Sequence, residues 1–568
     1  MAPVPEAVTC DVLVVGSGAA GLTAAITARR AGLEVIITEK TEFYGGTTAL
    51  SGGFAWLPCN SKAGAEGIAD SRAAALDYLR FEAGNCFDSA RAEAFVDNAG
   101  AMMEAIERDS AMEFFLAPEF PDYHPDAPGG MSGGRSLGSV EYDGRKLGKH
   151  FKRMRRPLPQ ITFFGMFLGS GQEIQHYFNV TRSVRSAWFV ARRSAGHIRD
   201  MLVHGRGAKL TQGGAMVARL ARTVFDLEIP LWLSSPVERL TLEGGRVTGA
   251  TVARIGADVE VRARRGVLLA SGGFPGNSVR RASVFPHAAQ GHDHVSVALP
   301  TNVGDGAKLA EGVGGAFSAH VLRGAPLLPV SLIPGKTGNE AAFPHLIDRT
   351  KPGIIAVLRN GKRFVNEAAS YHDFVVALID AASGTGAPEA FMIADRRALA
   401  RYGLGYAKPF PLPHSHLVRA GYLLRASTLD GLAELAGIDR EGLEATIATL
   451  NTDAAAGRDT AFGRGDGAYD RYQGDPHHAP NSCLGPIATP PFYAVRVIPG
   501  DIGSFAGLRT DGHARVLDGD GRVVAGLYAA GADSVHVGGG SYPGAGANIG
   551  PAMTFGFIAA KAMAAEAR

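Results

Sequence analysis

The chain is poor in the features that mark several classes of protein. Its four cysteines among 568 residues stand far apart, without CxxC or metal-ligand spacing, which fits a reducing compartment and argues against structural disulfides. Lysine plus arginine (57) nearly balances aspartate plus glutamate (55), so the net charge of +2 gives no reason to expect a nucleic acid partner. No uncharged apolar run has the length that a bilayer span needs. We therefore expect no disulfide scaffold, no nucleic acid partner and no membrane span.

The N-terminal residues also lack a secretion signal. No positively charged segment with an apolar stretch and a cleavage site precedes the first predicted strand, so we expect a cytoplasmic protein. Paired histidines, such as His414 and His416, have no matching cysteine or carboxylate spacing, and no metal site is predicted. With 46% apolar residues, the chain has the size and composition for two or three domains with ample core.

The first forty residues carry a nucleotide-binding pattern. An apolar run (11–15) is followed by Gly-Ser-Gly-Ala-Ala-Gly, an alanine-rich stretch and a second apolar run that ends at Glu39. Gly16 allows a tight turn, Gly18 lets backbone N–H groups approach a pyrophosphate, and Gly21 lets helix and strand pack closely. The helix N-terminus favours phosphate, and Glu39 can accept both ribose hydroxyls. The pattern predicts a strand–turn–helix–strand unit that binds an ADP group.

A second small-residue loop follows the acid, at 44–48 and 51–53. A nicotinamide cofactor does not need it, whereas a cofactor laid deep along the domain needs close backbone approach and short polar side chains. Here the chain resembles the flavoproteins of the fumarate reductase and 3-ketosteroid dehydrogenase superfamily. Two later segments match in order, a strand and turn at 266–273 and a strand at 526–533 that would bring an acid near the ribityl chain. The resemblance implies FAD, held noncovalently because the loop has no histidine placed for attachment.

The predicted FAD-binding residues are mostly small or carry short polar side chains: Gly16, Ser17, Gly18, Ala19, Ala20, Gly21, Glu39, Lys40, Gly45, Gly46, Thr47, Thr48, Ser51, Gly52, Gly53, Val237, Ala270, Ser271, Gly272, Gly531, Asp533, Ala547, Asn548 and Ile549.

The order of the segments predicts an α/β fold, with a Rossmann-like FAD-binding domain (mixed sheet with helices) and an inserted α+β catalytic or capping domain. We expect the first part of the FAD-binding domain at 1–288, the capping domain at 289–488 and the return segment at 489–568. An excursion at 129–204 contains the aromatic run Phe163–Phe167. We interpret this run as a lid over an apolar substrate and the arginines that follow it as solvated.

Three short motifs carry candidate catalytic tyrosines. Tyr123 lies in a proline-bracketed turn, Tyr371 follows Asn-Gly-Lys-Arg-Phe-Val-Asn-Glu by four residues, and Tyr542 lies in the glycine-rich segment 538–548. The last motif is the most specific, because Pro543 fixes the tyrosine beside backbone N–H groups at the start of a predicted helix. Such donors can hold a carbonyl oxygen and stabilise the enolate formed when an α-proton is lost.

In the soluble fumarate reductases, arginines stand about where Tyr371 and Tyr542 stand here. The set Tyr123, Tyr371, Tyr542 and Gly546 resembles the active site of 3-ketosteroid 1-dehydrogenases. That resemblance implies that the Tyr542 hydroxyl and the Gly546 N–H hold the ketone oxygen. It also implies that Tyr371, as a phenolate helped by Tyr123, removes the α-proton, while the flavin N5 takes a hydride from the β-carbon. A phenol ordinarily has a pKa of ~10, so Tyr371 would need a lowered pKa to act as the base.

The expected activity is the FAD-dependent introduction of a C=C bond α,β to a ketone, with 3-ketosteroid 1(2)-dehydrogenation as the leading reaction. Three alternatives stay open: 4(5)-dehydrogenation or desaturation of a smaller cyclic ketone, reduction of an unsaturated acid as in fumarate reductases, and a non-catalytic flavin-binding redox protein. The expected partners are an apolar, steroid-like cyclic ketone and an external electron acceptor, either a quinone or an electron-transfer protein. Weak peripheral association with a membrane also stays open.

Overall fold

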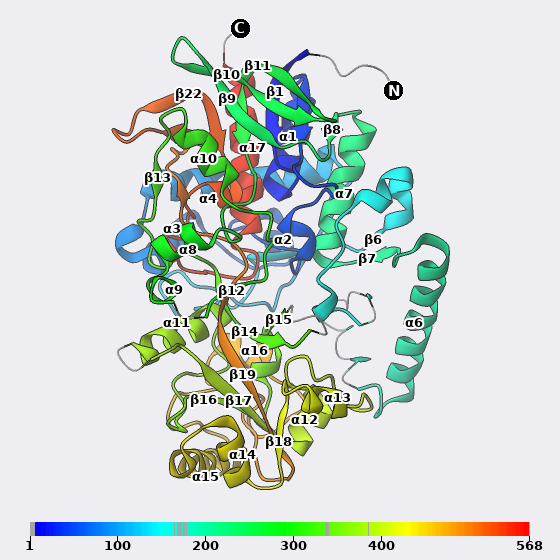
Figure 1. Ribbon diagram of the computed structural model, residues 1–568, viewed down its shortest axis with the longest axis vertical. Coiled ribbons are helices and arrows are strands. Elements are labelled where there is room, and N and C mark those ends of the chain that lie inside the picture. Colours follow the sequence, from blue (N-terminus) through cyan, green and yellow to red (C-terminus); the bar gives the residue numbers. More distant parts are fainter. Residues whose placement is uncertain are drawn as a thin grey trace.

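The computed structural model describes residues 6–163, 165–166, 173, 176–177, 179–291, 293–335, 340–383 and 386–566. Two main sheets lie toward opposite ends of the long axis, and both chain termini lie at the end that holds the first sheet (Figure 1).

The first sheet has eight strands in the order β21-β22-β10-β11-β1-β2-β8, with β9 paired to β10. Its strands are β1 (Ala7–Val15), β2 (Val35–Thr38), β8 (Leu231–Trp232), β9 (Val237–Glu243), β10 (Arg246–Arg254), β11 (Ala257–Leu269), β21 (Arg515–Leu517) and β22 (Val523–Ala529). β1 pairs in parallel with both β2 and β11, and β11 pairs in parallel with β22. The carboxyl ends of these strands therefore meet at one edge, where a ligand is generally bound in such sheets.

The predicted strand–turn–helix–strand unit at the N-terminus is confirmed. Helix α1 (Ala19–Arg30) follows β1 after a glycine turn and leads to β2. Gly21 is required by close packing, because a Cβ there would lie 2.1 Å from the Gly16 carbonyl oxygen. A larger residue at either position would force the helix away from the strand that it covers.

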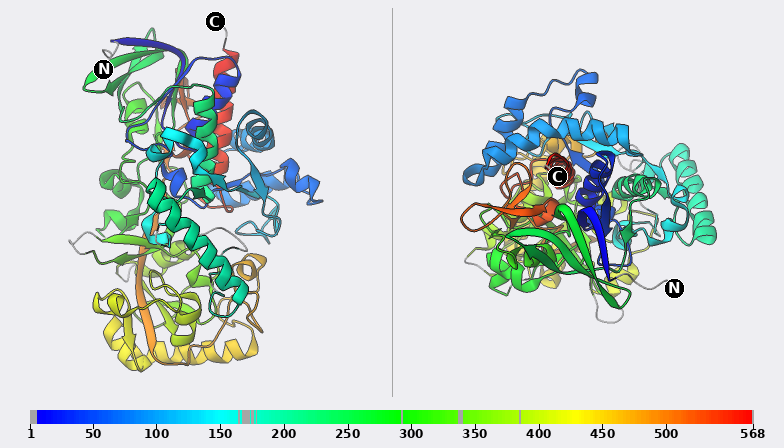
Figure 2. Two further views of the ribbon diagram at one scale, coloured as in Figure 1. Left: turned by 90° about the vertical axis from the view of Figure 1, so that its right-hand side faces the viewer. Right: turned by 90° about the horizontal axis from the view of Figure 1, so that it is seen from above.

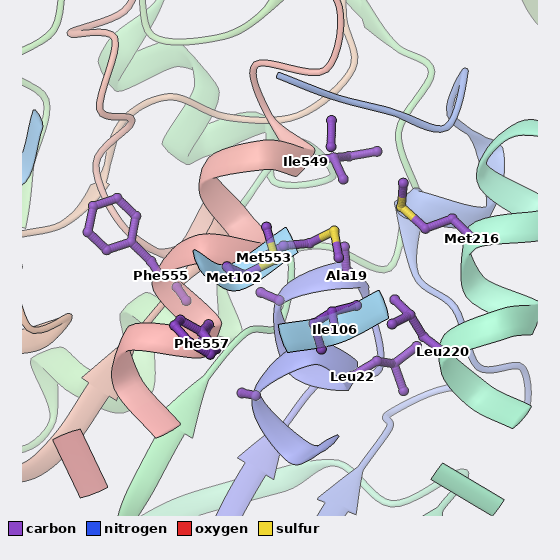
Figure 3. Packing of buried hydrophobic residues seen from close by; sticks show 14 of the residues in the cluster. Ala19, Leu22, Met102, Ile106, Met216, Leu220, Ile549, Met553, Phe555 and Phe557 are labelled. Carbon is purple, nitrogen blue, oxygen red and sulfur yellow. The ribbon is translucent and has the colours of Figure 1, made fainter. Parts of the chain in front are cut away.

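Helix α1 packs against α17 (Ile549–Ala565), α7 (Gln212–Asp226) and α4 (Ser89–Asp109). Figure 3 shows Leu22 of α1 among Met553, Met102 and Leu220, one from each of these helices. All four side chains are fully buried. A side chain of this kind stabilises the fold by ~1.5–3 kcal/mol relative to exposure, so this cluster is a rigid base for the turn after β1.

The second sheet has seven strands in the order β15-β14-β19-β17-β16, with β12 and β18 paired to β19. Its strands are β12 (Val295–Ser296), β14 (Leu327–Ile333), β15 (Ala341–Pro344), β16 (Ile354–Val357), β17 (Ala390–Asp395), β18 (Leu424–Ala426) and β19 (Phe492–Asp501). The predicted boundary between residues 488 and 489 falls just before β19. The structure pairs β19 with β14 and β17 in this sheet, and the chain re-enters the first sheet at β21. The domain limits themselves stay a prediction.

Helices cover both faces of the second sheet. Ile354 and Met392 pack with residues of α11 (Tyr371–Ala382) and α12 (Arg396–Tyr402). Ile355 and Ile393 point the other way, toward α14 (Leu429–Ala436) and α15 (Arg440–Ala456). The continuous apolar runs of β16 and β17 follow from this burial on two faces.

Shorter elements join the two sheets. They are β3 (Phe54–Trp56), β4 (Phe114–Leu116), β5 (Ser136–Ser139), β6 (Tyr142–Asp143), β7 (Lys209–Leu210), β13 (Phe317–Ser318), β20 (Gly507–Leu508), α2 (Ser61–Ala65), α3 (Arg72–Ala83), α8 (Ser278–Val284), α9 (Pro286–Ala289), α10 (Asp305–Glu311), α13 (Ser415–Arg419) and α16 (Ala468–Gln473).

Helix α6 (Val184–His204) lies on the outside of the molecule, at the level between the two sheets (Figure 2). The Ser183 hydroxyl caps its first turn, and Gly205 ends it in the left-handed conformation at φ 68°. Across the described ranges, we find no helix that combines the length and the apolar character of a bilayer span.

Candidate active site

A cavity of about 1770 Å³ runs between the carboxyl ends of the first sheet and the loops above the second. Small-molecule pockets generally measure ~300–1,000 Å³, so this cavity has room for a dinucleotide together with a second ligand. Its walls come from the glycine turn after β1, the start of α17, the start of α11 and the loop at 402–412.

One end of the cavity is built around Ser17. Its hydroxyl donates to Glu39 Oε2 at 2.6 Å and accepts from the Gly45 N–H at 3.0 Å. The second loop also reaches α1, where Thr48 Oγ1 accepts from the Ala19 N–H at 3.0 Å. Three segments that the sequence marked separately are thus joined by side-chain hydrogen bonds at the start of α1, where N–H groups favour a phosphate.

The glycines here leave space that a side chain would fill. Gly16, at φ 114°, passes so close to β11 that a Cβ would lie 2.1 Å from the Ala270 carbonyl oxygen. Gly46, Gly272 and Gly531 also have positive φ and line the cavity. The helices α1 and α17 both begin at this wall. A glycine cradle with two helix N-termini and a buried acid fits the phosphates and ribose of FAD.

Most predicted cofactor residues line the cavity: Gly16, Ser17, Gly18, Ala19, Ala20, Glu39, Lys40, Gly46, Thr47, Thr48, Ser51, Gly52, Gly53, Val237, Ala270, Ser271, Gly272, Gly531, Asn548 and Ile549. Four others lie behind the wall: Gly21, Gly45, Asp533 and Ala547.

Asp533, which we expect near the ribityl chain, is not among the residues that line the cavity, and its contact with the cofactor stays a prediction. Its carboxylate accepts hydrogen bonds from the backbone N–H and the hydroxyl of Ser271. It also accepts from the Gly273 N–H at 3.0 Å. Burial raises the pKa of this carboxyl, and only 2% of the residue is exposed. Asp533 therefore holds the turn after β11 from behind.

Sequence reasoning missed two cavity residues. Asn302 donates to Thr47 Oγ1 at 3.1 Å and to the Gly272 carbonyl at 3.0 Å, so it joins the two glycine loops. Tyr469, at the start of α16, lies 4.9 Å from Tyr123 between ring centroids. No local pattern marks Asn302, because its partners are 255 and 30 residues away.

Three tyrosines from distant segments meet at the cavity. Tyr123 follows β4, Tyr371 is the first residue of α11, and Tyr542 lies in the loop before α17. The Tyr123 hydroxyl donates to the Tyr371 hydroxyl at 3.3 Å. The Tyr542 ring stacks on Tyr123 with centroids 5.4 Å apart and meets Tyr371 edge-on at 5.4 Å. The structure thus brings the three predicted tyrosines together.

Backbone contacts fix these rings. The Tyr123 N–H donates to the Pro543 carbonyl at 2.9 Å, and the Tyr78 hydroxyl donates to the same oxygen at 2.6 Å. Gly546 lines the cavity at φ 93°, where a Cβ would lie 2.5 Å from the Phe54 carbonyl. The loop that carries Tyr542 is therefore held on both sides, and only glycine fits at its end.

A charged clamp ties the three segments together. His124 Nδ1 lies 2.6 Å from Glu82 Oε1, and its Nε2 lies 3.0 Å from Asp373 Oδ2. The Ser541 hydroxyl donates to the other oxygen of Glu82. Burial would lower the pKa of His124, but the hydrogen bonds to Asp373 and Glu82 outweigh it and raise the pKa from 6.5 to about 11. The clamp thus joins residues within two positions of each tyrosine.

The expectation that Tyr371 has a lowered pKa is wrong for the protein alone. Burial raises the pKa of Tyr371 well above its usual range. Burial also raises the pKa of Tyr542 to about 12. Burial likewise raises the pKa of Tyr123 well above its usual range, and the buried guanidinium of Arg349 opposes part of that rise. A phenolate at Tyr371 is therefore a rarer but stronger base.

The excursion at 129–204 contributes to the cavity wall. Phe163, Arg182 just before α6 and Arg185 in the first turn of α6 line it. Phe164 and Phe167, from the aromatic run predicted to form a lid, lie outside the described residues. The lid therefore stays a prediction.

Comparisons with known proteins agree with this geometry. Residues 11–549 match the family described as FAD binding domain. The chain is 38% identical to the 4-oxocyclohex-2-ene-1-carboxylate 5-dehydrogenase of Sinomonas cyclohexanicum, covering 98% of this chain and 94% of that protein. It is 35% identical to the 3-oxosteroid 1-dehydrogenase of Mycolicibacterium smegmatis, covering 98% and 97%. The solved 3-ketosteroid delta1-dehydrogenase of Sterolibacterium denitrificans, in complex with 1,4-androstadiene-3,17-dione, has 35% identity and a TM-score of 0.89, covering 98% of this chain and 99% of that one.

Proposed function

The chain belongs to the FAD binding domain family and is an FAD-dependent dehydrogenase of the 3-oxosteroid 1-dehydrogenase type, and we propose that it desaturates a ring ketone beside its carbonyl group. The leading substrate is a 3-oxosteroid, oxidised at its 1(2) bond. The observation that supports this most is the meeting of Tyr123, Tyr371 and Tyr542 with Gly546 on one cavity wall.

Each residue has one task in the proposed reaction. The Tyr542 hydroxyl and the Gly546 N–H donate to the ketone oxygen and stabilise the negative charge that develops there. The Tyr371 phenolate takes the α-proton, and Tyr123, 3.3 Å from it, donates a hydrogen bond that stabilises the phenolate. FAD, when bound, supplies the acceptor for the hydride that leaves the β-carbon. The electrons and the proton of the new C=C bond are thus accounted for.

A second candidate substrate is a small cyclic oxo acid. The 38% identity to a dehydrogenase of an oxocyclohexene carboxylate supports it. A reductase of unsaturated acids is less well supported, because tyrosines stand where those enzymes have arginines that bind the acid and deliver the proton.

Product analysis tests the proposal. The FAD-loaded protein is incubated with a saturated 3-oxosteroid or with 4-oxocyclohexanecarboxylate and an artificial electron acceptor, and the products are identified by mass and NMR. We expect loss of two hydrogens, with the new double bond conjugated to the ketone. A product desaturated at the 4(5) bond would correct the regiochemistry, and no oxidation of any ketone would refute the activity.

We propose that the acceptor of the electrons is a quinone or an electron-transfer protein.

We also propose that the outer face of α6 rests on an anionic lipid surface. Its apolar row is exposed, with 89% of Val184, 71% of Trp188, 59% of Ile198 and 83% of Leu202 accessible. Two exposed arginines, Arg192 and Arg199, run beside the row seven residues apart.

The charge pattern of α6 disfavours a second copy as its partner. The one acidic residue of the helix, Asp200, is buried and accepts from the Ala208 N–H at 3.1 Å. Two such helices would repel each other, whereas anionic lipid attracts arginines beside an apolar row. Vesicles with anionic lipid should therefore sediment the protein, and vesicles of neutral lipid or a Trp188→Ser, Leu202→Ser variant should not. A stable dimer in solution that this variant abolishes would refute the lipid proposal.

A further inference from the structure

Lys408, Arg182 and Arg185 are among the basic side chains that line the cavity, and within the described ranges none of these three pairs with a carboxylate. The residues outside those ranges contain no aspartate or glutamate that could pair with them. Arg182 and Arg185 are exposed and solvated, whereas Lys408 is half-buried. Lys408 is thus a half-buried cation on the cavity wall with no carboxylate paired to it in the described ranges.

The surroundings of the Lys408 ammonium are apolar. Its Nζ lies 5.0 Å from the centroid of the Phe343 ring and 5.5 Å from that of Tyr406. The ammonium donates a long hydrogen bond to the Gln160 carbonyl, at 3.3 Å. Burial lowers the pKa of Lys408, because these contacts replace only part of the hydration that the ammonium loses.

The nearest acid does not neutralise this lysine. Asp348 raises the pKa of Lys408 through space, but its Oδ2 accepts from His345 Nδ1 at 2.7 Å and from the Gly405 N–H at 2.8 Å. The loop that carries Lys408 is also held in place, since the His414 ring lies 2.6 Å from the Lys408 carbonyl oxygen. The ammonium is thus a fixed cation on an apolar wall, which is the environment in which an anion is bound most strongly.

We propose that Lys408 binds a carboxylate carried by the substrate, at a subsite distinct from the tyrosines, with Arg182 and Arg185 adding to the positive potential of the wall. This inference rests on the proposed desaturation of a ring ketone. The loop at 402–412 and β15 form the subsite, whereas Tyr371 begins α11 and Tyr542 lies in the loop before α17. The ligand is therefore a ring ketone with a distal carboxylate. Two sources share this chemistry: a small cyclic oxo acid and a 3-oxosteroid with an acidic side chain.

The test compares each acid with its own methyl ester, which keeps the ring and the ketone but removes the charge. Binding is measured from the shift of the flavin absorption spectrum, and turnover from flavin reduction. In Lys408→Met we expect the Kd of the acid to rise by ~10- to 100-fold, the size of one charged hydrogen bond, while the Kd of the ester stays unchanged. Lys408→Arg should keep most of the affinity. Lys362→Met, an exposed lysine of the same domain, is the matched control and should bind both ligands normally.

Each other outcome refutes the inference. Equal weakening of acid and ester would mean that Lys408 only packs against the substrate, and no change in either would place the carboxylate elsewhere. The steroid acid and the small acid are separate arms, and the one whose affinity depends on Lys408 identifies the source. If ketones bind but none reduces the flavin of the wild-type protein, the proposed function fails, and the binding comparison still decides the role of Lys408.

Discussion

The hydroxyl oxygens of Tyr123 and Tyr371 lie 3.3 Å apart, although 248 residues separate them in the chain. The third tyrosine, Tyr542, contacts both rings. The adjacent His124 bridges Glu82 and Asp373, so that the phenols are brought together by contacts one or two residues away from them. In the proposed reaction, the Tyr123–Tyr371 pair would handle the proton and Tyr542 would hold the ketone oxygen.

Replacing Tyr542 by Phe should lower turnover by ~100-fold or more, because it removes one donor to the developing oxyanion. FAD content should not change, since no contact assigns this side chain to the cofactor. The measurement is steady-state turnover of the ketone with an artificial acceptor. Tyr528→Phe is the control, because that hydroxyl bonds Glu566 at 2.8 Å, away from the cavity. Equal turnover of the two variants would contradict the role of Tyr542.

The protein should be yellow and release its FAD on denaturation. The loop at 44–53 has no histidine placed for covalent attachment. Acid or heat precipitation should leave the yellow colour in the supernatant, where FAD is measured by absorbance. Colour that stays with the pellet would show covalent attachment.

The rate of flavin reduction should rise with pH. In the proposed reaction only the phenolate of Tyr371 accepts the α-proton, and burial raises the pKa of this phenol well above its usual range. Below that pKa, the fraction of Tyr371 in the phenolate form increases roughly tenfold for each unit of pH. Anaerobic stopped-flow reduction across neutral and alkaline pH measures the slope. A rate that is already constant at neutral pH would mean that another group takes the proton.

The clamp around His124 should make stability depend on pH. Its pKa rises from 6.5 to about 11 on folding, so its contribution is complete below pH 6.5 and is lost as the pH rises toward 11. His124→Asn should lower the free energy of unfolding by ~1–3 kcal/mol at neutral pH, a value kept small because the ring is partly exposed. The difference between wild type and variant should shrink at alkaline pH in denaturant unfolding. A difference that grows with pH would contradict the charged clamp.

Local patterns predicted the βαβ unit that brings Gly16, Ser17 and Glu39 to the cavity wall, because the spacing of such a unit is set by backbone geometry. The motif around Tyr542 was also recognisable, since glycine and proline restrict the chain there. Asn302 and Glu82, which binds His124, had no such local signal, because their hydrogen-bond partners lie far away in the sequence. The lowered pKa expected for Tyr371 failed for the same reason, since burial by distant segments sets it.

The central claim is that Tyr371 removes the proton while Tyr542 holds the ketone. Anaerobic stopped-flow mixing of ketone with FAD-loaded Tyr371→Phe tests it most directly, with a binding titration on the same protein. We predict that the ketone still perturbs the flavin spectrum with near wild-type affinity while flavin reduction nearly stops, because the phenol acts on the proton and does not hold the substrate. Flavin reduction at the wild-type rate in Tyr371→Phe would contradict the account.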